Sequence, residues 1–448
     1  MIHQYKNNGY NIVMDVCSGA IHVVDDVTYD VIALYEEKSL EEIENELSYS
    51  KEDIEEAYKE VTSLKEEGLL FTEDIYEDYI KEVKSRKTVV KALCLHIAHD
   101  CNLACRYCFA EEGEYKGHRE LMSAKVGKAA LDFLVANSGN RHNLEVDFFG
   151  GEPTMNFGVV KEVVEYGRSL EEKHNKHFRF TLTTNGVLLN DEIMEFANKE
   201  MDNVVLSVDG RKEIHDYMRP TRNGKPSYDL IMPKFIRFAE SRHQQKYYVR
   251  GTFTNRNLDF SKDVLHLADL GFEQISMEPV VGQPEEPYAI QEKDLPQIFD
   301  EYDRLAKEMI KREKAGKGFN FFHFMIDLTG GPCVYKRLSG CGSGTEYLAV
   351  TPWGDFYPCH QFVGEEQFLM GNVDEGITRP EIRDQFGKCN VYTKEACKDC
   401  FARFYCSGGC AANAYHFQKD INGNYGIGCE LQRKRVECAI MIKAALAE

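Results

Sequence analysis

The fold class is decided by one short stretch, His99-Asp100-Cys101-Asn102-Leu103-Ala104-Cys105-Arg106-Tyr107-Cys108, in which three cysteines follow a C-x3-C-x2-C pattern. Three thiolates at this spacing can hold three corners of an iron–sulfur cube, which normally takes four Cys ligands. The fourth iron is then left without a protein ligand, and an open coordination position is typical of a catalytic metal site. The alternative is a zinc knot that takes its fourth ligand from His96 or His99.

The composition is that of an acidic, globular chain. Its 448 residues suggest two or three domains, and 43% hydrophobic with 29% charged residues is ordinary for a soluble enzyme. A net charge of −20 without a basic stripe argues against nucleic-acid binding. The first residues lack the apolar core of a signal peptide, and no apolar run reaches the roughly 20 residues of a membrane helix. We therefore expect a cytoplasmic enzyme with no nucleic-acid and no membrane partner.

The chain contains 15 cysteines, far more than chance predicts. In a reducing compartment these are expected to be metal ligands or catalytic thiols rather than disulfides. Most fall into two spaced sets. The four that stand apart are predicted to be small buried hydrophobes: Cys17, Cys94, Cys389 and Cys438.

Residues 1–80 are predicted to form a separate winged-helix-like unit, followed by a linker at 81–87. Ser39 with Glu42, and Ser50 with Asp53 or Glu55, suit helix starts. The unit is too acidic to bind DNA, but a hairpin with an exposed edge can capture a peptide as an added strand. The alternative is a packing or dimerisation module. The predicted elements are strands at Asn11–Cys17 and Ala20–Val24, helices at Thr28–Tyr35, Ser39–Leu47 and Ser50–Glu67, and a returning strand at Leu69-Leu70-Phe71.

Residues 88–320 alternate strand and helix, which predicts an α/β fold with a parallel sheet curled into a partial or full barrel. Polar or metal-binding residues follow almost every strand. Because the C-terminal strand ends carry the chemistry of β/α barrels, six loops are expected to converge on one site. The predicted strands are Val89–Ile97, Leu144–Phe149, Phe178–Thr183, Val204–Val208, Tyr247–Phe253 and Gln274–Val280.

Residues 321–448 lose this alternation and read as loops, short hairpins and turns. Such a segment is too irregular to build a large core, so we expect metal coordination to stabilise it. Its cysteines in the spaced set are Cys333, Cys341, Cys359, Cys397, Cys400, Cys406, Cys410 and Cys429.

The cluster loop, with the aromatic Tyr107 before its last cysteine, resembles that of the radical S-adenosylmethionine (SAM) enzymes, and Gly150-Gly151-Glu152-Pro153 resembles their GGEP segment. The glycines let backbone approach a ligand, and the Glu152 carboxylate can accept bonds from an ammonium group. The resemblance implies a partial (β/α)6 barrel in which SAM chelates the open iron. Further candidate cofactor-binding residues are Ser207, Asp209, Arg219, Asn185 and Glu278; strand-end capping is the alternative for Ser207 and Asp209.

The tail resembles the SPASM domain, an extension that carries two auxiliary 4Fe-4S clusters, which makes three clusters in all. The resemblance implies that the fourth ligand of the inner cluster is Cys333, or that this cluster keeps an open iron for a substrate thiolate. The implied ligands are Cys397, Cys400, Cys406 and Cys429 for the outer cluster, and Cys341, Cys359 and Cys410 for the inner one.

Together with the acidic N-terminal unit, the chain resembles peptide maturases with a RiPP recognition element, above all those of the six-cysteines-in-forty-five (SCIFF) peptides. The resemblance implies a radical SAM oxidoreductase of the thioether (sactionine) type, which acts on a ribosomally made precursor with a leader and takes electrons from a ferredoxin or flavodoxin. A 5′-deoxyadenosyl radical would abstract hydrogen from the peptide. His360, where sulfatase-maturing enzymes have an Asp base, is either a proton acceptor with a pKa near neutrality or a spectator. Alternatives are carbon–carbon crosslinking, decarboxylation, epimerisation or formylglycine formation, and a zinc-stabilised peptide-binding protein.

Overall fold

The structure, a computed structural model, describes residues 1–83, 88–117, 119–328 and 334–447. Its main feature is an eleven-stranded sheet in the order β10-β9-β8-β7-β6-β5-β4-β11-β12-β13-β14. Seven of these strands are parallel neighbours that follow one another in chain order. The prediction of an α/β fold with a mostly parallel sheet is confirmed. The strands are β4 (Ala92–Ala98), β5 (Asn143–Gly150), β6 (His177–Thr184), β7 (Met201–Ser207), β8 (Tyr247–Phe253), β9 (Gln274–Pro279) and β10 (Asn320–Phe321).

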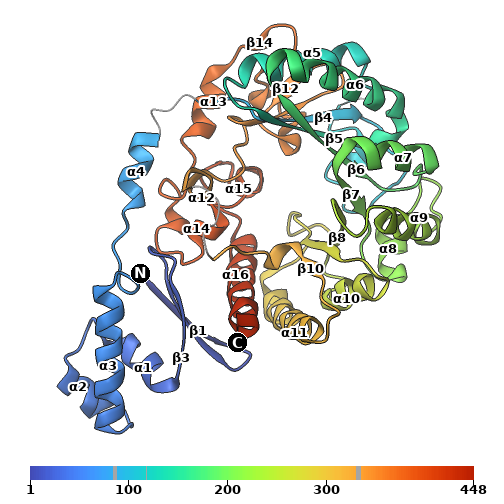
Figure 1. Ribbon diagram of the computed structural model, residues 1–448. Helices are drawn as coiled ribbons and strands as arrows, with labels where there is room; N and C mark the ends of the chain where they lie inside the picture. The colour runs from blue at the N-terminus through green and yellow to red at the C-terminus, as the bar shows by residue number, and fades with distance from the viewer. Residues whose placement is uncertain (84–87, 118, 329–333, 448) are drawn as a thin grey trace.

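Helices cover the outer face of this curved sheet (Figure 1). Along β5 and β6 every second side chain is buried, among them Phe148, Phe178 and Phe180. Because side chains alternate along a strand, one set of residues faces the helices and the other faces the inner side of the sheet, where the site lies. The helices are α5 (Ala124–Asn137), α6 (Phe157–His174), α7 (Asp191–Glu200), α8 (Lys212–Met218), α9 (Tyr228–Ser241), α10 (Ser261–Asp269) and α11 (Leu295–Lys314).

The C-terminal part continues the sheet through β11 (Tyr347–Val350), which pairs in parallel with β4. Antiparallel strands β12 (Asp355–Tyr357), β13 (Gly371–Asn372) and β14 (Gly376–Ile377) follow. Short helices then alternate with loops, as the composition predicts: α12 (Val334–Ser339), α13 (Pro380–Gly387), α14 (Arg403–Cys406) and α15 (Ala411–Gln418).

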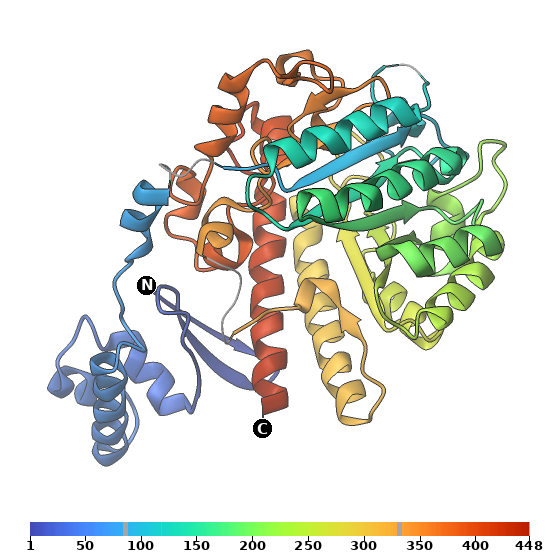
Figure 2. The same cartoon turned by 45° about the horizontal axis from the view of Figure 1, so that its top comes forward.

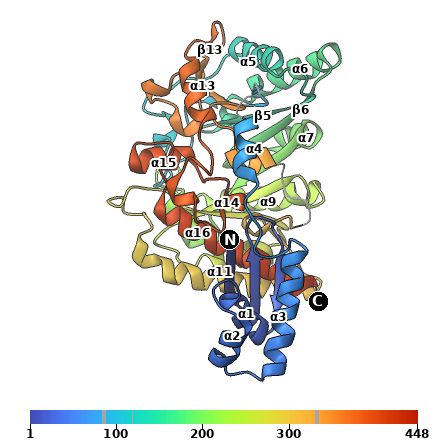
Figure 3. The same ribbon diagram turned by 90° about the vertical axis from the view of Figure 1, so that its left-hand side faces the viewer.

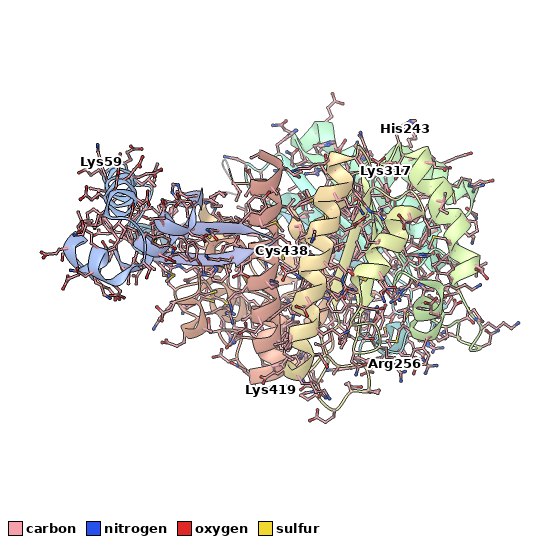
Figure 4. The ribbon with its side chains drawn as sticks, turned by 90° about the horizontal axis from the view of Figure 1, so that it is seen from below. Lys59, His243, Arg256, Lys317, Lys419 and Cys438 are labelled. Carbon is pink, nitrogen blue, oxygen red and sulfur yellow. The ribbon has the colours of Figure 1, made fainter. Side chains whose placement is uncertain are left out.

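One long helix in the tail departs from the expected irregularity. Helix α16 (Gly426–Ala447) lies beside α11, as Figures 2 and 4 show. It buries Leu431, Val436 and Ile440, so the tail shares the core of the sheet domain. The core is larger than the sequence predicts, because charged residues interrupt the apolar run of this helix.

The N-terminal unit stands at one side of the molecule with a core of its own (Figure 3). It consists of the antiparallel strands β1 (Ile2–Asn7), β2 (Tyr10–Asp15) and β3 (Ile21–Val24), and of α1 (Asp26–Leu34), α2 (Leu40–Glu46) and α3 (Lys51–Glu66). Helix α4 (Tyr76–Val83) follows and packs against the tail, where the rings of Tyr76 and Phe404 lie 5.3 Å apart. The predicted helix starts at Ser39 and Ser50 are confirmed, since both residues cap helices.

Two strand predictions for this unit are wrong. Strand β1 was missed because its polar residues hide the alternation, and it pairs with β2 along its whole length. The returning strand at Leu69-Leu70-Phe71 is not formed, although Leu70 is buried. Gly68, which ends helix α3 with φ +71°, is followed by an irregular segment instead. In the part of the chain that the structure describes, no helix is long and apolar enough to cross a membrane.

Candidate active site

A cavity of about 590 Å³ lies at the C-terminal ends of the parallel strands. Its wall contains the cluster loop, the GGEP segment, strand ends and part of the tail. The inward-facing residues of successive strands line it: Phe149 on β5, Thr183 on β6, Ser207 on β7, Arg250 and Thr252 on β8, and Glu278 on β9. Parallel strands bring their C-terminal ends to one edge of the sheet, and the period of two along each strand turns these side chains toward the cavity.

The three cysteines of the cluster loop all face this cavity. The Sγ of Cys101 accepts hydrogen bonds from the Leu103 backbone N–H (3.5 Å) and from Asn185 Nδ2 (3.6 Å). Burial raises the pKa of Cys101 and of Cys105 to about 12, so both thiols keep their protons at pH 7 unless a metal displaces them. The three thiols face one cavity, and two N–H donors already point at the sulfur of Cys101. This arrangement fits the binding of an iron–sulfur cluster.

His96 and His99, the fourth ligands of a zinc knot, lie outside this cavity wall. The two rings are fully buried and are hydrogen-bonded to each other, with 2.9 Å between His96 Nδ1 and His99 Nε2. Within the described residues, no three His, Cys, Asp or Glu side chains lie close enough together to hold one metal ion.

The glycines of the GGEP segment allow the end of β5 to approach the cluster loop closely. A Cβ on Gly150, which has φ +123°, would lie 2.4 Å from the Ala98 oxygen, and one on Gly151 would lie 2.1 Å from the Asp100 oxygen. Backbone bonds join the two segments, from Gly151 N to Ala98 O (2.7 Å) and from Glu152 N to Asp100 O (2.8 Å). Any side chain here would push the two segments apart. Pro153 lies in the cavity wall beside them.

The Glu152 carboxylate is buried and is already engaged by donors of the chain. It accepts bonds from Asn185 N (2.7 Å), from Thr184 Oγ1 (2.8 Å) and from both the N–H (3.1 Å) and the hydroxyl of Thr154. Burial raises the pKa of Glu152, while these bonds act in the opposite direction. The carboxylate therefore connects the ends of β5 and β6, a role that the sequence analysis did not anticipate.

A buried network joins the cluster loop to the end of β7. The Asp209 carboxylate, fully buried, accepts bonds from Tyr107 Oη (2.6 and 2.8 Å), Arg219 Nε (3.0 Å) and the Thr252 backbone N–H (3.0 Å). Tyr107, Ser207 and Arg219 line the cavity, whereas Asp209 lies behind them. Although burial opposes it, Asp209 and Tyr107 raise the pKa of Arg219 well above its ordinary value, so the guanidinium stays charged.

Two arginines that the sequence analysis missed surround Glu278. Arg250 and Arg435 approach its carboxylate at 3.6 and 3.8 Å, and His323 at 3.4 Å. Burial raises the pKa of Glu278, but these three neighbours together lower it. The inward position of Arg250 on β8 was the only sequence signal for this cluster, because Arg435 comes from the distant helix α16.

His360 lies in the cavity wall between Phe109 and Phe149, with ring centroids 5.6 and 5.2 Å away. Burial and the charge of Arg250 lower the pKa of His360 to about 4. The expectation of a pKa near neutrality is therefore wrong, because the side chain has left water for an aromatic environment.

The comparisons with known proteins agree with this geometry. Residues 95–242 match the model of the radical SAM superfamily. The chain is 30% identical over 301 residues to the uncharacterized protein MJ0907 of Methanocaldococcus jannaschii, across 66% of this chain and 94% of that protein. The chain belongs to the radical SAM superfamily.

This radical SAM chain is also 25% identical over 352 residues to the cysteine-type anaerobic sulfatase-maturating enzyme of Clostridium novyi, across 74% of this chain and 90% of that enzyme. Two solved structures share the fold. One is anSMEcpe with bound AdoMet (TM-score 0.66, 20% identity, 80% of this chain and 96% of that one). The other is Streptococcus suis SuiB bound to precursor peptide SuiA (TM-score 0.53, 16% identity, 95% and 98%).

The tail cysteines of the radical SAM chain lie in two groups. In the first, which we call the inner group, Cys359 has Cys410 and Cys341 as neighbours. In the second, the outer group, Cys406 has Cys429, Cys397 and Cys400 as neighbours. Donors already face two outer sulfurs, Asn424 Nδ2 at 3.8 Å from Cys429 and Arg433 Nη1 at 3.9 Å from Cys400.

The remaining cysteines have different surroundings. Cys333 lies outside the described residues. Cys17, Cys94 and Cys438 are buried as expected, but Cys389 is only half-buried and lies near Cys341 and Cys410.

Proposed function

We propose that this radical SAM protein is a peptide maturase that forms thioether bonds between cysteines and carbon atoms of a ribosomally made, Cys-rich peptide. The observation that carries the proposal is that one cavity is lined both by the cluster loop and by the cysteine-rich tail, through residues such as His360, Asn413 and Phe417. A peptide in this cavity would lie between the two thiol-bearing regions. The relatives support a peptide substrate, since SuiB is solved with a precursor peptide.

The same proposal assigns the parts of the chain. Residues 88–320 would be the partial (β/α)6 barrel, 321–448 the SPASM domain and 1–80 the RiPP recognition element. Of the proposed linker at 81–87, residues 81–83 are the end of helix α4 and residues 84–87 lie outside the described residues. The order of the parallel strands supports the first assignment, and the two cysteine groups support the second. Cys101, Cys105 and Cys108 would hold the SAM-binding 4Fe-4S cluster, and the inner and outer groups would hold two auxiliary clusters.

SAM is proposed to bind along the wall formed by the GGEP backbone, Asn185, Ser207 and Arg219. Tyr107, Glu152 and Asp209 hold these groups in place, because their polar atoms are engaged within the protein. Glu278 and Arg250, on the adjoining strands β9 and β8, would face the peptide.

When bound, SAM and the clusters would supply the electron chemistry: an electron from the donor would cleave SAM to methionine and a 5′-deoxyadenosyl radical, and an auxiliary cluster would take up the electron released at bond formation. The peptide carbon would lose a hydrogen atom, and a cysteine thiol of the peptide would lose its proton as sulfur bonds to that carbon. Each thioether therefore removes two hydrogens from the peptide. The pKa of His360, lowered to about 4, makes its ring a weak acceptor for a thiol proton, so His360 would line the cavity as a spectator and the thiol proton would pass to water in this partly open cavity.

The N-terminal unit is proposed to bind the leader as a further strand. In the described sheet β3 pairs only with β2, so its other edge is available for pairing. Holding the leader there raises the effective concentration of the core peptide at the cavity.

The test is to incubate the reduced, reconstituted enzyme with SAM, a ferredoxin or flavodoxin type donor and a Cys-rich precursor peptide, and to measure the product mass. We expect a loss of two hydrogens per link and one thiol fewer open to alkylation for each link. The matched control is the variant Cys101→Ala/Cys105→Ala/Cys108→Ala, which should leave the peptide unchanged. A product of unchanged mass whose thiols all alkylate would refute the proposal.

A second candidate is another peptide modification with the same cofactors, such as formylglycine formation, carbon–carbon crosslinking, decarboxylation or epimerisation. The similarity to a cysteine-type sulfatase-maturating enzyme is the observation that supports this second candidate. Product mass and thiol count separate most of these reactions from a thioether.

A further inference from the structure

A buried lysine lies next to the tail cysteines. The Lys394 side chain is 2% exposed, and its Nζ donates to the backbone oxygens of Ile421 (3.0 Å) and Gly423 (2.9 Å). Among the described residues, no carboxylate is within ion-pair distance of this ammonium. Burying a charge that only neutral carbonyls face is strongly unfavourable unless negative charge is nearby.

Lys394 lies beside the turn that joins the two groups of tail cysteines. Its stem crosses the turn between Cys406 of the outer group and Cys410 of the inner group, where a Cβ on Gly408 (φ +85°) would come within 3.3 Å of Lys394 Cδ. Lys394 also lines a small hollow together with Cys341 and Cys389. The ammonium and the Cys389 thiol share one acceptor, the Ile421 carbonyl, from which Cys389 Sγ is 3.4 Å away.

The charge of Lys394 acts on thiols of both groups. Its ammonium is close enough to act electrostatically on Cys397 of the outer group and on Cys410 of the inner group. The ammonium therefore favours negative charge on both sides of the turn.

We propose that Lys394 is a charge-compensating residue shared by the two auxiliary clusters, whose buried ammonium raises their reduction potentials. A cluster with thiolate ligands is an anion, and each added electron makes it more negative. A cation at close range in a medium of low polarity stabilises the reduced form more than the oxidised form. The inference rests on the proposed function for the presence of the clusters, and it explains how they would become electron acceptors after sulfur bonds to carbon.

The test measures reduction potentials on the reconstituted full chain, in the background Cys101→Ala/Cys105→Ala/Cys108→Ala so that only auxiliary clusters give signals. Iron and sulfide are counted first, and the potentials are then read from a redox titration followed by electron paramagnetic resonance. Lys394→Gln keeps a side-chain donor for the carbonyls but removes the charge, and Lys394→Arg keeps the charge. The matched control is Lys398→Met, because Lys398 also lies beside Cys397 but is 54% exposed and pairs with Glu395.

We expect Lys394→Gln to keep its iron and to shift the auxiliary potentials to more negative values, while Lys394→Arg and Lys398→Met stay at the value of the parent chain. Loss of iron in Lys394→Gln with retention in Lys394→Arg also supports the proposal, since only the charge differs. Unchanged potentials in Lys394→Gln, or equal loss of iron in both Lys394 variants, overturn it. A parent chain that binds zinc and no iron overturns the proposed function as well, so the two failures are distinguishable.

Discussion

Replacing Asp209 tests the buried network behind the candidate SAM wall. The Arg219 side chain is only 12% exposed and Asp209 is its ion-pair partner, while Tyr107 reaches the same carboxylate from the cluster loop. Asp209→Leu leaves the guanidinium buried without a counter-charge. Asp209→Asn keeps an acceptor of similar shape but removes the charge.

The size of each effect follows from what remains unpaired. Removing one partner of a buried ion pair costs about 3–5 kcal/mol, a large share of the roughly 5–15 kcal/mol by which a domain is stable. Losing only the charge assistance of these hydrogen bonds costs about 1.5–3 kcal/mol. If Arg219 binds the SAM carboxylate, a loss of the same 1.5–3 kcal/mol in binding lowers SAM affinity by about 10- to 150-fold, since 1.4 kcal/mol is tenfold.

The assays are urea unfolding of the full chain and equilibrium dialysis of SAM with reconstituted enzyme. The matched control is Asp229→Asn, because Asp229 is 72% exposed and forms a surface pair with Lys212. We expect both measurements to stay unchanged in that control. Wild-type SAM affinity together with a wild-type unfolding midpoint in Asp209→Asn would show that the network positions nothing.

Three further outcomes are expected. Glu152→Gln places an amide N–H against the Asn185 backbone N–H, so this variant should be less stable by about 1–3 kcal/mol in urea unfolding. An unchanged unfolding midpoint would mean that the Asn185 N–H finds another acceptor. Burial, with the charge of Glu145, raises the pKa of Asp147 from 3.8 to about 6. The protonated Asp147 side chain therefore stabilises the fold fully below pH 3.8, and this contribution is lost as the pH rises through 6. Asp147→Asn should be more stable than wild type at pH 7, by roughly 3 kcal/mol at most, and equal stability at pH 7 would contradict this. Changing Cys101, Cys105 and Cys108 to Ala should remove about four irons per chain, whereas Cys94→Ala, in the buried strand β4, should remove none; equal iron in both variants would be inconsistent with the proposed cluster.

Patterns within short stretches of sequence were enough to predict the framework of the molecule. The six strands from β4 to β9 could be predicted because a run of apolar residues between two turns is typical of a buried strand. The position of the site followed from the same pattern, since parallel strands bring their carboxyl ends to one edge. The cysteine spacing of the cluster loop needed no tertiary information, because its ligands lie within one loop.

The elements that were missed depend on neighbours distant in the chain. Strand β1 is polar and becomes a strand only by pairing with β2. The segment Leu69-Leu70-Phe71 is apolar, but Leu70 is buried in the N-terminal core without joining the sheet. Helix α16 contains buried Arg435, which the sequence did not single out and which faces Tyr302 and Glu278 in the fold.

The amino-acid sequence by itself determined which chemistry this chain is equipped for, because thiol spacing and strand periodicity are local properties. Only the tertiary structure decided how the charges are arranged around that chemistry. Asp209 joins Tyr107 to Arg219, Glu152 takes its donors from two strand ends, and Lys394 lies between two groups of cysteines. Each arrangement brings together side chains from separate loops, and the low polarity of the interior makes their charges matter.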